Sequence, residues 1–269
     1  MRFCERFLVA PGAKVDLSDH DPDFCAGLGD KEHAPQRLDR FHKHLADLQE
    51  LLYAENRRAL LIVLQAMDAG GKDGTIRHVM GSVNPQGCRV TSFKVPTPEE
   101  LAHDFLWRIH KAVPRHGQIG IFNRSHYEDV LVVRVHDLCP KEVWSRRYDQ
   151  INDFEAALAA GGVHVLKFFL HISREEQLKR LKERLADPRK HWKISPEDFH
   201  ERPYWKKYMK AYADALSRCS TRHAPWFVIP ANKKWFRNLA VSRILVETLD
   251  GLDMKYPKPS FDLSTITVK

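Results

Sequence analysis

The segment from residue 59 to residue 75, ALLIVLQAMDAGGKDGT, constrains the fold more than any other part of the chain. It begins with an apolar run rich in branched side chains, Ala59 to Leu64, which predicts a buried strand. Two glycines and Lys72 follow, and a new helical period begins at Ile76. A strand that passes through a glycine turn and a lysine into a helix is typical of a phosphate-binding site, because backbone N–H groups and a helix N-terminus then face one anion.

This turn departs at two positions from the usual phosphate-binding pattern, Gly-x4-Gly-Lys-Ser/Thr. Ala66 replaces the first glycine, and Asp73 replaces the hydroxyl residue, although Thr75 lies two residues further on. On the local residues alone, an ordinary strand-to-helix turn that needs glycine for its geometry is the alternative. The surrounding chain has to decide between the two interpretations.

Length and composition indicate a soluble α/β protein of one domain or two small ones, because 269 residues with 43% hydrophobic content can bury a sizeable core. No apolar run approaches the ~18 residues of a membrane helix, and the first twenty residues lack a signal-peptide core. We therefore expect no membrane association and a cytoplasmic location. A disulfide framework or structural zinc is not expected either, because the five cysteines are far apart: Cys4, Cys25, Cys88, Cys139 and Cys219.

Hydrophobic periodicity predicts alternating strands and helices, which indicates a parallel sheet. Residues 1–34 carry no motif and are expected to form an arm, residues 35–253 the main domain, and residues 254–269 a loosely ordered tail. The expected helices cover residues 35–53, 76–80, 98–111, 140–160 and a final segment that ends near 251. The expected strands cover residues 59–64, 89–95, 118–122, 163–172 and 226–230.

A polar cluster follows the third predicted strand, with the sequence Asn123-Arg124-Ser125-His126-Tyr127-Glu128-Asp129. Ligands of open α/β sheets bind beyond the carboxyl ends of the strands, so this cluster lies beside the lysine turn if the two strands are neighbours. Arginine suits phosphate, and an acidic residue after an apolar strand can hold Mg²⁺. Which of Glu128 and Asp129 would contact the metal stays open, and a solvent-exposed group of ion pairs is the alternative.

Much of the positive charge lies in residues 174–210. The net charge of +8 favours an anionic partner but does not distinguish nucleic acid, nucleotide, membrane surface and inorganic polyanion. This segment holds twelve Lys or Arg residues against seven Asp or Glu residues, and Asp187-Pro188 divides it into two predicted helices. A basic helical hairpin before the last strand predicts a lid over phosphates, the alternative being an ordinary solvated face.

Four segments, in this order, resemble the family-2 polyphosphate kinases over about residues 35–253: QAMDAGGKDGTI, IFNRSHYEDVLVVRV, LKFFLHISREEQLKRL and APWFVIPANKKWFRN. The resemblance implies a P-loop kinase fold similar to thymidylate kinase, with a five-stranded parallel sheet flanked by helices and a helical lid. It implies reversible transfer of a terminal phosphoryl group between inorganic polyphosphate and nucleotides with Mg²⁺, or with Mn²⁺ in its place. Asn123 followed by Glu128 and Asp129 looks most like the single-domain subgroup that accepts nucleoside mono- and diphosphates.

The resemblance also implies roles for single residues. It makes Asp68, Lys72, Arg124 and Asp129 catalytic, and Asp68, Glu128 and Asp129 ligands of the metal. Lys72 would hold the reacting phosphates and Arg124 would offset the charge that develops on the transferred group. On this basis Lys72→Ala and Asp129→Asn should each lower turnover on the order of 10³-fold or more. Phosphate binding is assigned to Ala69, Gly70, Gly71, Asp73, Gly74 and Thr75 of the turn and to Arg184, Arg189 and Lys190 of the lid.

The partners implied are inorganic polyphosphate and nucleoside mono- and diphosphates, without nucleic acid, in a dimer or tetramer packed through helices. Two other functions stay open. An ATP-dependent nucleoside monophosphate kinase would share the fold, the lysine turn and a basic lid. A non-catalytic nucleic-acid-binding protein would use the basic hairpin as a clamp, but the hairpin offers few aromatic side chains for base stacking, Trp192 and Tyr204 being the obvious candidates.

Overall fold

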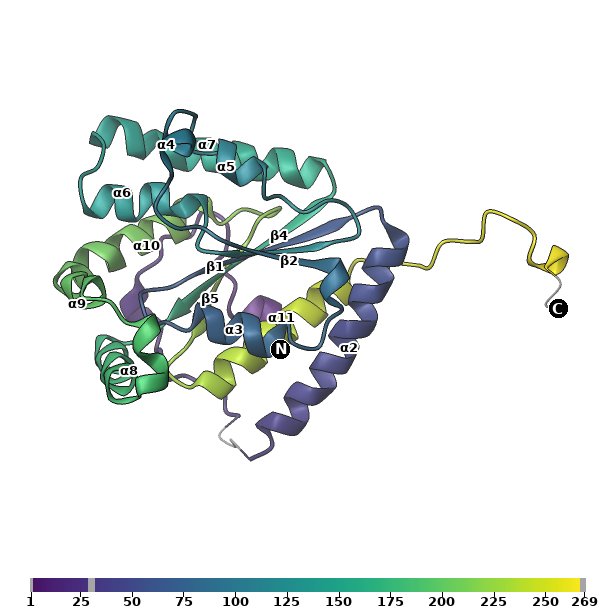
Figure 1. Ribbon diagram of the computed structural model, residues 1–269, viewed down its shortest axis with the longest axis horizontal. Coiled ribbons are helices and arrows are strands. Elements are labelled where there is room, and N and C mark those ends of the chain that lie inside the picture. Colours follow the sequence, from purple (N-terminus) through teal and green to yellow (C-terminus); the bar gives the residue numbers. More distant parts are fainter. Residues whose placement is uncertain (1, 29–31, 267–269) are drawn as a thin grey trace.

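The computed structural model describes residues 2–28 and 32–266 and contains a five-stranded parallel sheet in that part of the chain (Figure 1). The strand order is β2-β3-β1-β4-β5, and every neighbouring pair is parallel. The predicted strands are therefore confirmed in number and order along the chain. Their bounds are Ala59–Gln65 (β1), Cys88–Ser92 (β2), Ile119–Asn123 (β3), Val163–His171 (β4) and Trp226–Pro230 (β5).

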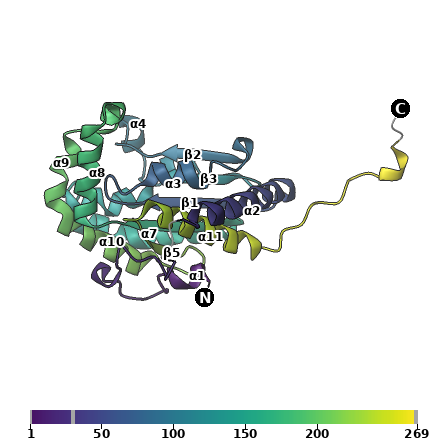
Figure 2. The ribbon, with the colours of Figure 1, turned by 90° about the horizontal axis from the view of Figure 1, so that it is seen from below.

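The central strand β1 is buried along its whole length because helices cover both faces of the sheet (Figure 2). Alternate side chains of the strand enter two different hydrophobic clusters: Leu61 and Val63 pack in one, and Leu60 and Ile62 in the other. A parallel strand with apolar side chains on both faces needs such a three-layer arrangement, which is why its sequence shows a continuous apolar run.

Two sets of helices cover the faces and a third lies at the end of the sheet. On one face are α5 (Trp107–His110), α6 (Val132–Val135), α7 (Lys141–Ala160) and α10 (Trp205–Cys219), and the short helix α4 (Pro98–Leu101), which precedes α5, buries no residue. On the other face are α1 (Phe3–Arg6), α2 (Ala34–Glu55), α3 (Lys72–Val79) and α11 (Lys234–Asp250). Figures 1 and 2 place the remaining two at the end where the strands terminate: α8 (Arg174–Ala186) and α9 (Glu197–His200).

Several helices differ from their predicted extents. The helix after the glycine turn begins at Lys72 instead of Ile76. The helix expected over residues 98–111 is two short helices, because the Asp104 side chain accepts a hydrogen bond from the backbone N–H of Leu106 and forms a turn between them. The second half of the predicted basic hairpin is also different: α10 runs to Cys219 and buries an apolar face in the core.

The N-terminal arm packs on the domain. Phe3 and Phe7 are buried, and the backbone N–H of Val9 donates to the carbonyl of Trp226 at 2.9 Å, so the arm adds an antiparallel bridge to the edge strand β5. The tail runs away from the domain after Met254 (Figure 1). Residues 1 and 29–31 of the predicted arm and 267–269 of the predicted tail lie outside the described residues.

The arm creates a pH-sensitive contact with the end of β4. Burial lowers the pKa of His171 from 6.5 to about 4, and the groups of the arm that affect it are His20 and Asp21. Between pH 4 and 6.5 the folded chain therefore binds fewer protons than the unfolded chain, so stability is lost as the pH falls through this window.

A His171→Gln variant is expected to show a smaller loss of unfolding free energy between about pH 7 and pH 5 than the unchanged chain. Urea unfolding at several pH values measures this slope. His223→Gln is the matched control, because it removes a histidine whose side chain is exposed. Equal slopes for the unchanged chain and His171→Gln would contradict the assignment.

Candidate active site

The glycine turn between β1 and α3 forms a tight loop that only small residues can build. Gly71 has φ of 104° and a side chain there would collide with Arg237, while a Cβ on Gly70 would lie 2.7 Å from the carbonyl oxygen of Met67. Both positions therefore require glycine. Lys72 is the first residue of α3, and its Nζ donates to the carbonyl of Ala66 at 2.9 Å across the loop. This bond holds the ammonium group inside the turn.

Two buried arginines lie against the same loop, and the sequence interpretation did not single them out. Arg180, from α8, donates to the carbonyls of Ala69 and Gly70 at 3.1 and 3.2 Å. Arg237, from α11, contacts Gly71 and Gly74, and burial together with the charge of Arg180 lowers its pKa to about 10. The two guanidinium groups therefore add positive charge beside the phosphate-binding loop.

The predicted cluster after β3 reaches the loop because β1 and β3 are neighbours. Arg124, in a left-handed conformation with φ of 63°, donates to Asp68 Oδ1 at 3.0 Å. Asn123 Nδ2 donates to Asp73 Oδ1 at 2.8 Å. These two bonds connect the polar residues at the end of β3 to the glycine turn, as the topology predicted.

Glu128 and Asp129 are consecutive in the sequence but face different surroundings. Glu128 is close enough to Arg124 and Lys72 for their charges to oppose the rise in its pKa that burial causes. Asp129 instead accepts a hydrogen bond from Arg147 of α7 at 2.9 Å, and burial raises its pKa to about 6. The structure therefore pairs Asp129 with Arg147, whereas the charge of Glu128 acts on Lys72, and the metal-binding role of Asp129 stays a prediction.

Only some residues of the segment predicted as a lid lie close to the glycine turn. Lys193 at its tip forms an ion pair of 3.6 Å with Asp73, so the lid closes on the first turn of α3. Arg184 lies near Asp198, with a separation of 4.0 Å. Arg189 points away: its side chain is 90% exposed and is paired with Asp187. A charged side chain in solvent contributes little to a site, and Arg189 is thereby a weaker candidate than its neighbours.

A cavity of about 730 Å³ lies between the glycine turn and the lid. The predicted residues that line it are Asp68, Ala69, Gly70, Gly71, Lys72, Asp73, Gly74, Arg124, Arg184 and Lys190. Four others do not line it: Thr75, Glu128, Asp129 and Arg189. Residues in its wall that the sequence interpretation missed as site residues include Lys94, Arg180, Trp192, Lys193, Asp198, Lys234 and Arg237.

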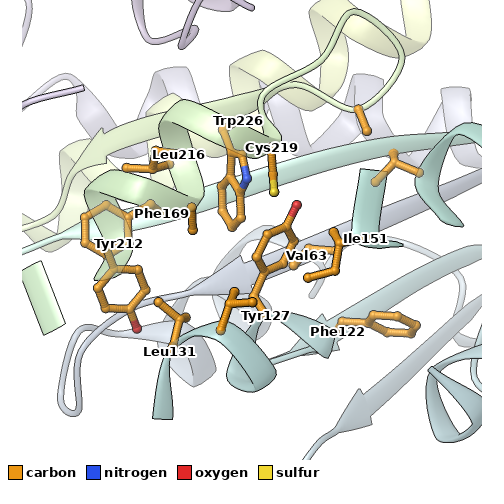
Figure 3. Packing of buried hydrophobic residues seen from close by; sticks show 14 of the residues in the cluster. Val63, Phe122, Tyr127, Leu131, Ile151, Phe169, Tyr212, Leu216, Cys219 and Trp226 are labelled. Carbon is orange, nitrogen blue, oxygen red and sulfur yellow. The ribbon is translucent and has the colours of Figure 1, made fainter. Parts of the chain in front are cut away.

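A buried polar network supports the turn that carries Arg124 and Glu128. Lys167 of β4, with no exposed surface, donates to Glu155 of α7 at 2.5 Å and to the Tyr127 hydroxyl at 2.8 Å. His126 and Tyr127 also contact Glu155, at 3.1 and 3.0 Å. Figure 3 shows the Tyr127 hydroxyl directed toward Cys219 and Trp226, deep in the core. Lys167 also donates to the carbonyl of Cys219 in α10 at 2.6 Å, so the network joins the turn to β4, α7 and α10.

The carboxylates of the cavity fit a divalent cation. Burial and then the charge of Asp68 raise the pKa of the Asp198 carboxyl, so two acidic groups from the turn and the lid approach one another. No group of three His, Cys, Asp or Glu side chains suited to a metal occurs in residues 2–28 and 32–266. Mg²⁺ commonly uses one or two carboxylates together with substrate phosphates, which is the donor set available here.

A family model described as polyphosphate kinase 2 matches residues 29–257. The chain belongs to the polyphosphate kinase 2 family. The AMP/ADP-polyphosphate phosphotransferase of Meiothermus ruber is 53% identical over 98% of this chain and 100% of its own length. The ADP-polyphosphate phosphotransferase of Rhodopseudomonas palustris is 46% identical over 94% of this chain and 92% of its own.

A solved structure of polyphosphate kinase 2 from Arthrobacter aurescens superposes with a TM-score of 0.94 and 46% identity, covering 98% of this chain and 94% of the other. Membership of the polyphosphate kinase 2 family confirms the predicted resemblance and the α/β, P-loop kinase fold. In the described part of the chain, no helix combines the length and apolarity needed to cross a membrane.

The position of Asp129 leads to a revised prediction. Asp129→Asn is expected to lower turnover by less than about ten-fold, because the carboxyl group contacts Arg147 outside the cavity. Steady-state rates at saturating substrates, with the thermal midpoint as a check of folding, measure the effect. If folded Asp129→Asn loses as much turnover as a Lys72 variant, Asp129 takes part in the reaction and this prediction is wrong.

Proposed function

We propose that this protein is a polyphosphate-dependent nucleotide kinase that transfers the terminal phosphoryl group of inorganic polyphosphate to nucleotides. The observation that carries the proposal is the convergence of Lys72, Arg124 and Arg184 on one cavity closed by a basic lid. The phosphate-binding turn can hold a phosphoryl group during transfer, as a kinase requires. Several separate cations can bind a phosphoryl donor of variable length, such as polyphosphate.

In the proposed reaction, a terminal phosphate oxygen of the nucleotide forms a bond to the end phosphorus of polyphosphate while the bridging P–O bond to the rest of the chain breaks. Lys72 and the backbone N–H groups of the turn hold the transferred group. Arg124, which Asp68 orients at 3.0 Å, offsets the charge that develops on that group. Arg184 and Lys193 bring the lid over it and exclude water.

We propose Mg²⁺ as the cofactor, with Mn²⁺ as a substitute, held by Asp68 and by phosphate oxygens, with Asp198 facing it from the lid. Glu128 would act on Lys72 through its negative charge, which favours the charged form of the ammonium group. When bound, the cation neutralises phosphate oxygens during transfer. The chain's own residues supply the rest, because phosphoryl transfer depends on positioning and charge.

We propose nucleoside mono- and diphosphates as acceptors, with adenine and guanine nucleotides among them. The relative from Meiothermus ruber, whose name gives AMP and ADP, supports the adenine nucleotides. Trp192 is 79% exposed and lines the cavity, where its indole ring can stack on any base. We therefore propose little discrimination between adenine and guanine. We also propose a cytoplasmic dimer or tetramer, an expectation from the family that light scattering tests.

An assay without ATP tests the activity and separates it from an ATP-dependent nucleoside monophosphate kinase. AMP or ADP is incubated with polyphosphate and Mg²⁺, and the formation of ADP and ATP is followed. Product formation supports the proposal, whereas turnover of AMP only when ATP is supplied would favour the alternative. A protein that binds duplex nucleic acid tightly and turns over neither donor would contradict both.

A further inference from the structure

A second hollow of about 310 Å³ lies beside the active-site cavity, along the free edge of β2. In the described residues β2 pairs with β3 on one side and with no strand on the other. We call this hollow the edge groove; its walls include Arg89, Thr91, Lys94, Arg108 and Lys111. Ser92, Phe93 and Lys94 line both the edge groove and the cavity, so the two are continuous.

The charge of the edge groove is positive and mostly uncompensated. Arg89, Lys94 and Lys111 are exposed and form no ion pair with a carboxylate in residues 2–28 and 32–266. The acidic residue in the wall, Glu100, is already engaged: it lies 3.6 Å from Arg108 and accepts the backbone N–H of Thr97 at 2.8 Å. Free backbone N–H groups at the edge of β2 add further donors.

The aromatic rings near the edge groove are covered and offer no stacking face for a base. The Lys111 ammonium lies 4.1 Å from the centroid of the Trp107 ring, and His103 stacks on that ring at the same separation. Arg108 lies over Phe93 at 5.5 Å. In the cavity, Trp192 is 79% exposed, with the Lys193 ammonium 4.7 Å from the centroid of its ring. The edge groove therefore suits phosphate groups without an attached base.

We propose that the edge groove binds the part of the polyphosphate chain that lies beyond the reacting end. This inference rests on the proposed function and adds a second phosphate-binding region to the same site. A long polyanion bound at the glycine turn has to leave the cavity, and the walls shared through Lys94 give it a continuous positive path. Short chains would end within the cavity and would not reach Arg89 or Lys111.

The test is a neutralising pair, Arg89→Gln with Lys111→Gln, assayed with ADP and either long-chain polyphosphate or hexaphosphate. We expect KM for the long chain to rise about five-fold and to become less sensitive to salt, because two exposed phosphate contacts are lost. KM for hexaphosphate, KM for ADP and kcat should stay unchanged. Lys206→Gln with Arg222→Gln is the matched control, since it removes two exposed positive charges away from both hollows.

Each other outcome overturns the proposal. An equal rise in KM for long and short chains, or the same rise in the control pair, would show only a general effect of net charge. A rise in KM for ADP would assign the edge groove to the nucleotide. Unchanged KM for the long chain would leave the groove without this role. Turnover of hexaphosphate by the unaltered protein tests the proposed activity separately, so a failure of one inference is distinguishable from a failure of the other.

Discussion

Lys72→Ala is expected to lower turnover on the order of 10³-fold or more while the protein stays folded. The ammonium group is held inside the glycine turn by the carbonyl of Ala66, 2.9 Å away. Burial lowers its pKa, as does the neighbouring Arg124, whereas Asp68 and Glu128 favour the charged form. A point charge in this position stabilises phosphate oxygens in the transition state, and no other group can take its place without moving.

The measurement is single-turnover transfer from polyphosphate to ADP, so that product release does not hide the chemical step. Lys206→Ala, at an exposed position of α10, is the matched control and should leave the rate unchanged. Lys72→Arg is informative as well, because a larger guanidinium keeps the charge but does not fit the turn. A near-normal rate of transfer by folded Lys72→Ala would show that Lys72 is not needed for the reaction.

Lys167→Met is expected to lower the free energy of unfolding by about 3–5 kcal/mol. Neither Lys167 nor Glu155 has exposed surface, and removal of the lysine leaves a buried carboxylate with only the hydrogen bonds of His126 and Tyr127. Burial lowers the pKa of Lys167, while the charge of Glu155 opposes that change. Each charge therefore depends on the other.

Urea unfolding of the single variants and of Lys167→Met with Glu155→Leu measures this dependence. The double variant should recover much of the loss, because it removes both charges together. If the double variant loses as much unfolding free energy as the two single variants together, the ion pair is not the main interaction of either residue. If the double variant is folded but slow, the network also positions the turn that carries Arg124.

The parallel sheet was predictable from the alternating strands and helices. The proximity of Arg124 to the glycine turn was predicted on the condition that their two strands are neighbours, which the pairing of β1 with β3 fulfils. The contributions of Arg180 and Arg237 were not predictable. Both contact the loop only because α8 and α11 pack against it, and neither has a local spacing that signals this role. The directions of Glu128 and Asp129 depend on the phase of a 3₁₀ turn, which no residue pattern determines.

The extent of the lid was misjudged for a different reason. Counting charges over residues 174–210 drew attention to the lysines of α10 and away from its apolar spacing. Tyr208, Ala211, Tyr212 and Ala215 are buried along one face of that helix, so it belongs to the core. A hydrophobic pattern of three and four was present in the sequence and would have identified it.

The ion pair between Lys193 and Asp73 explains why an acid occupies the place where related turns carry a hydroxyl group. Asp73 is the counterion that Lys193 has before a substrate arrives. An incoming phosphate group competes for a lysine that already has a partner, so opening and closing exchange one attraction for another of similar strength. We therefore expect this competition to weaken the retention of a highly charged polymer and to ease the release of a shortened chain.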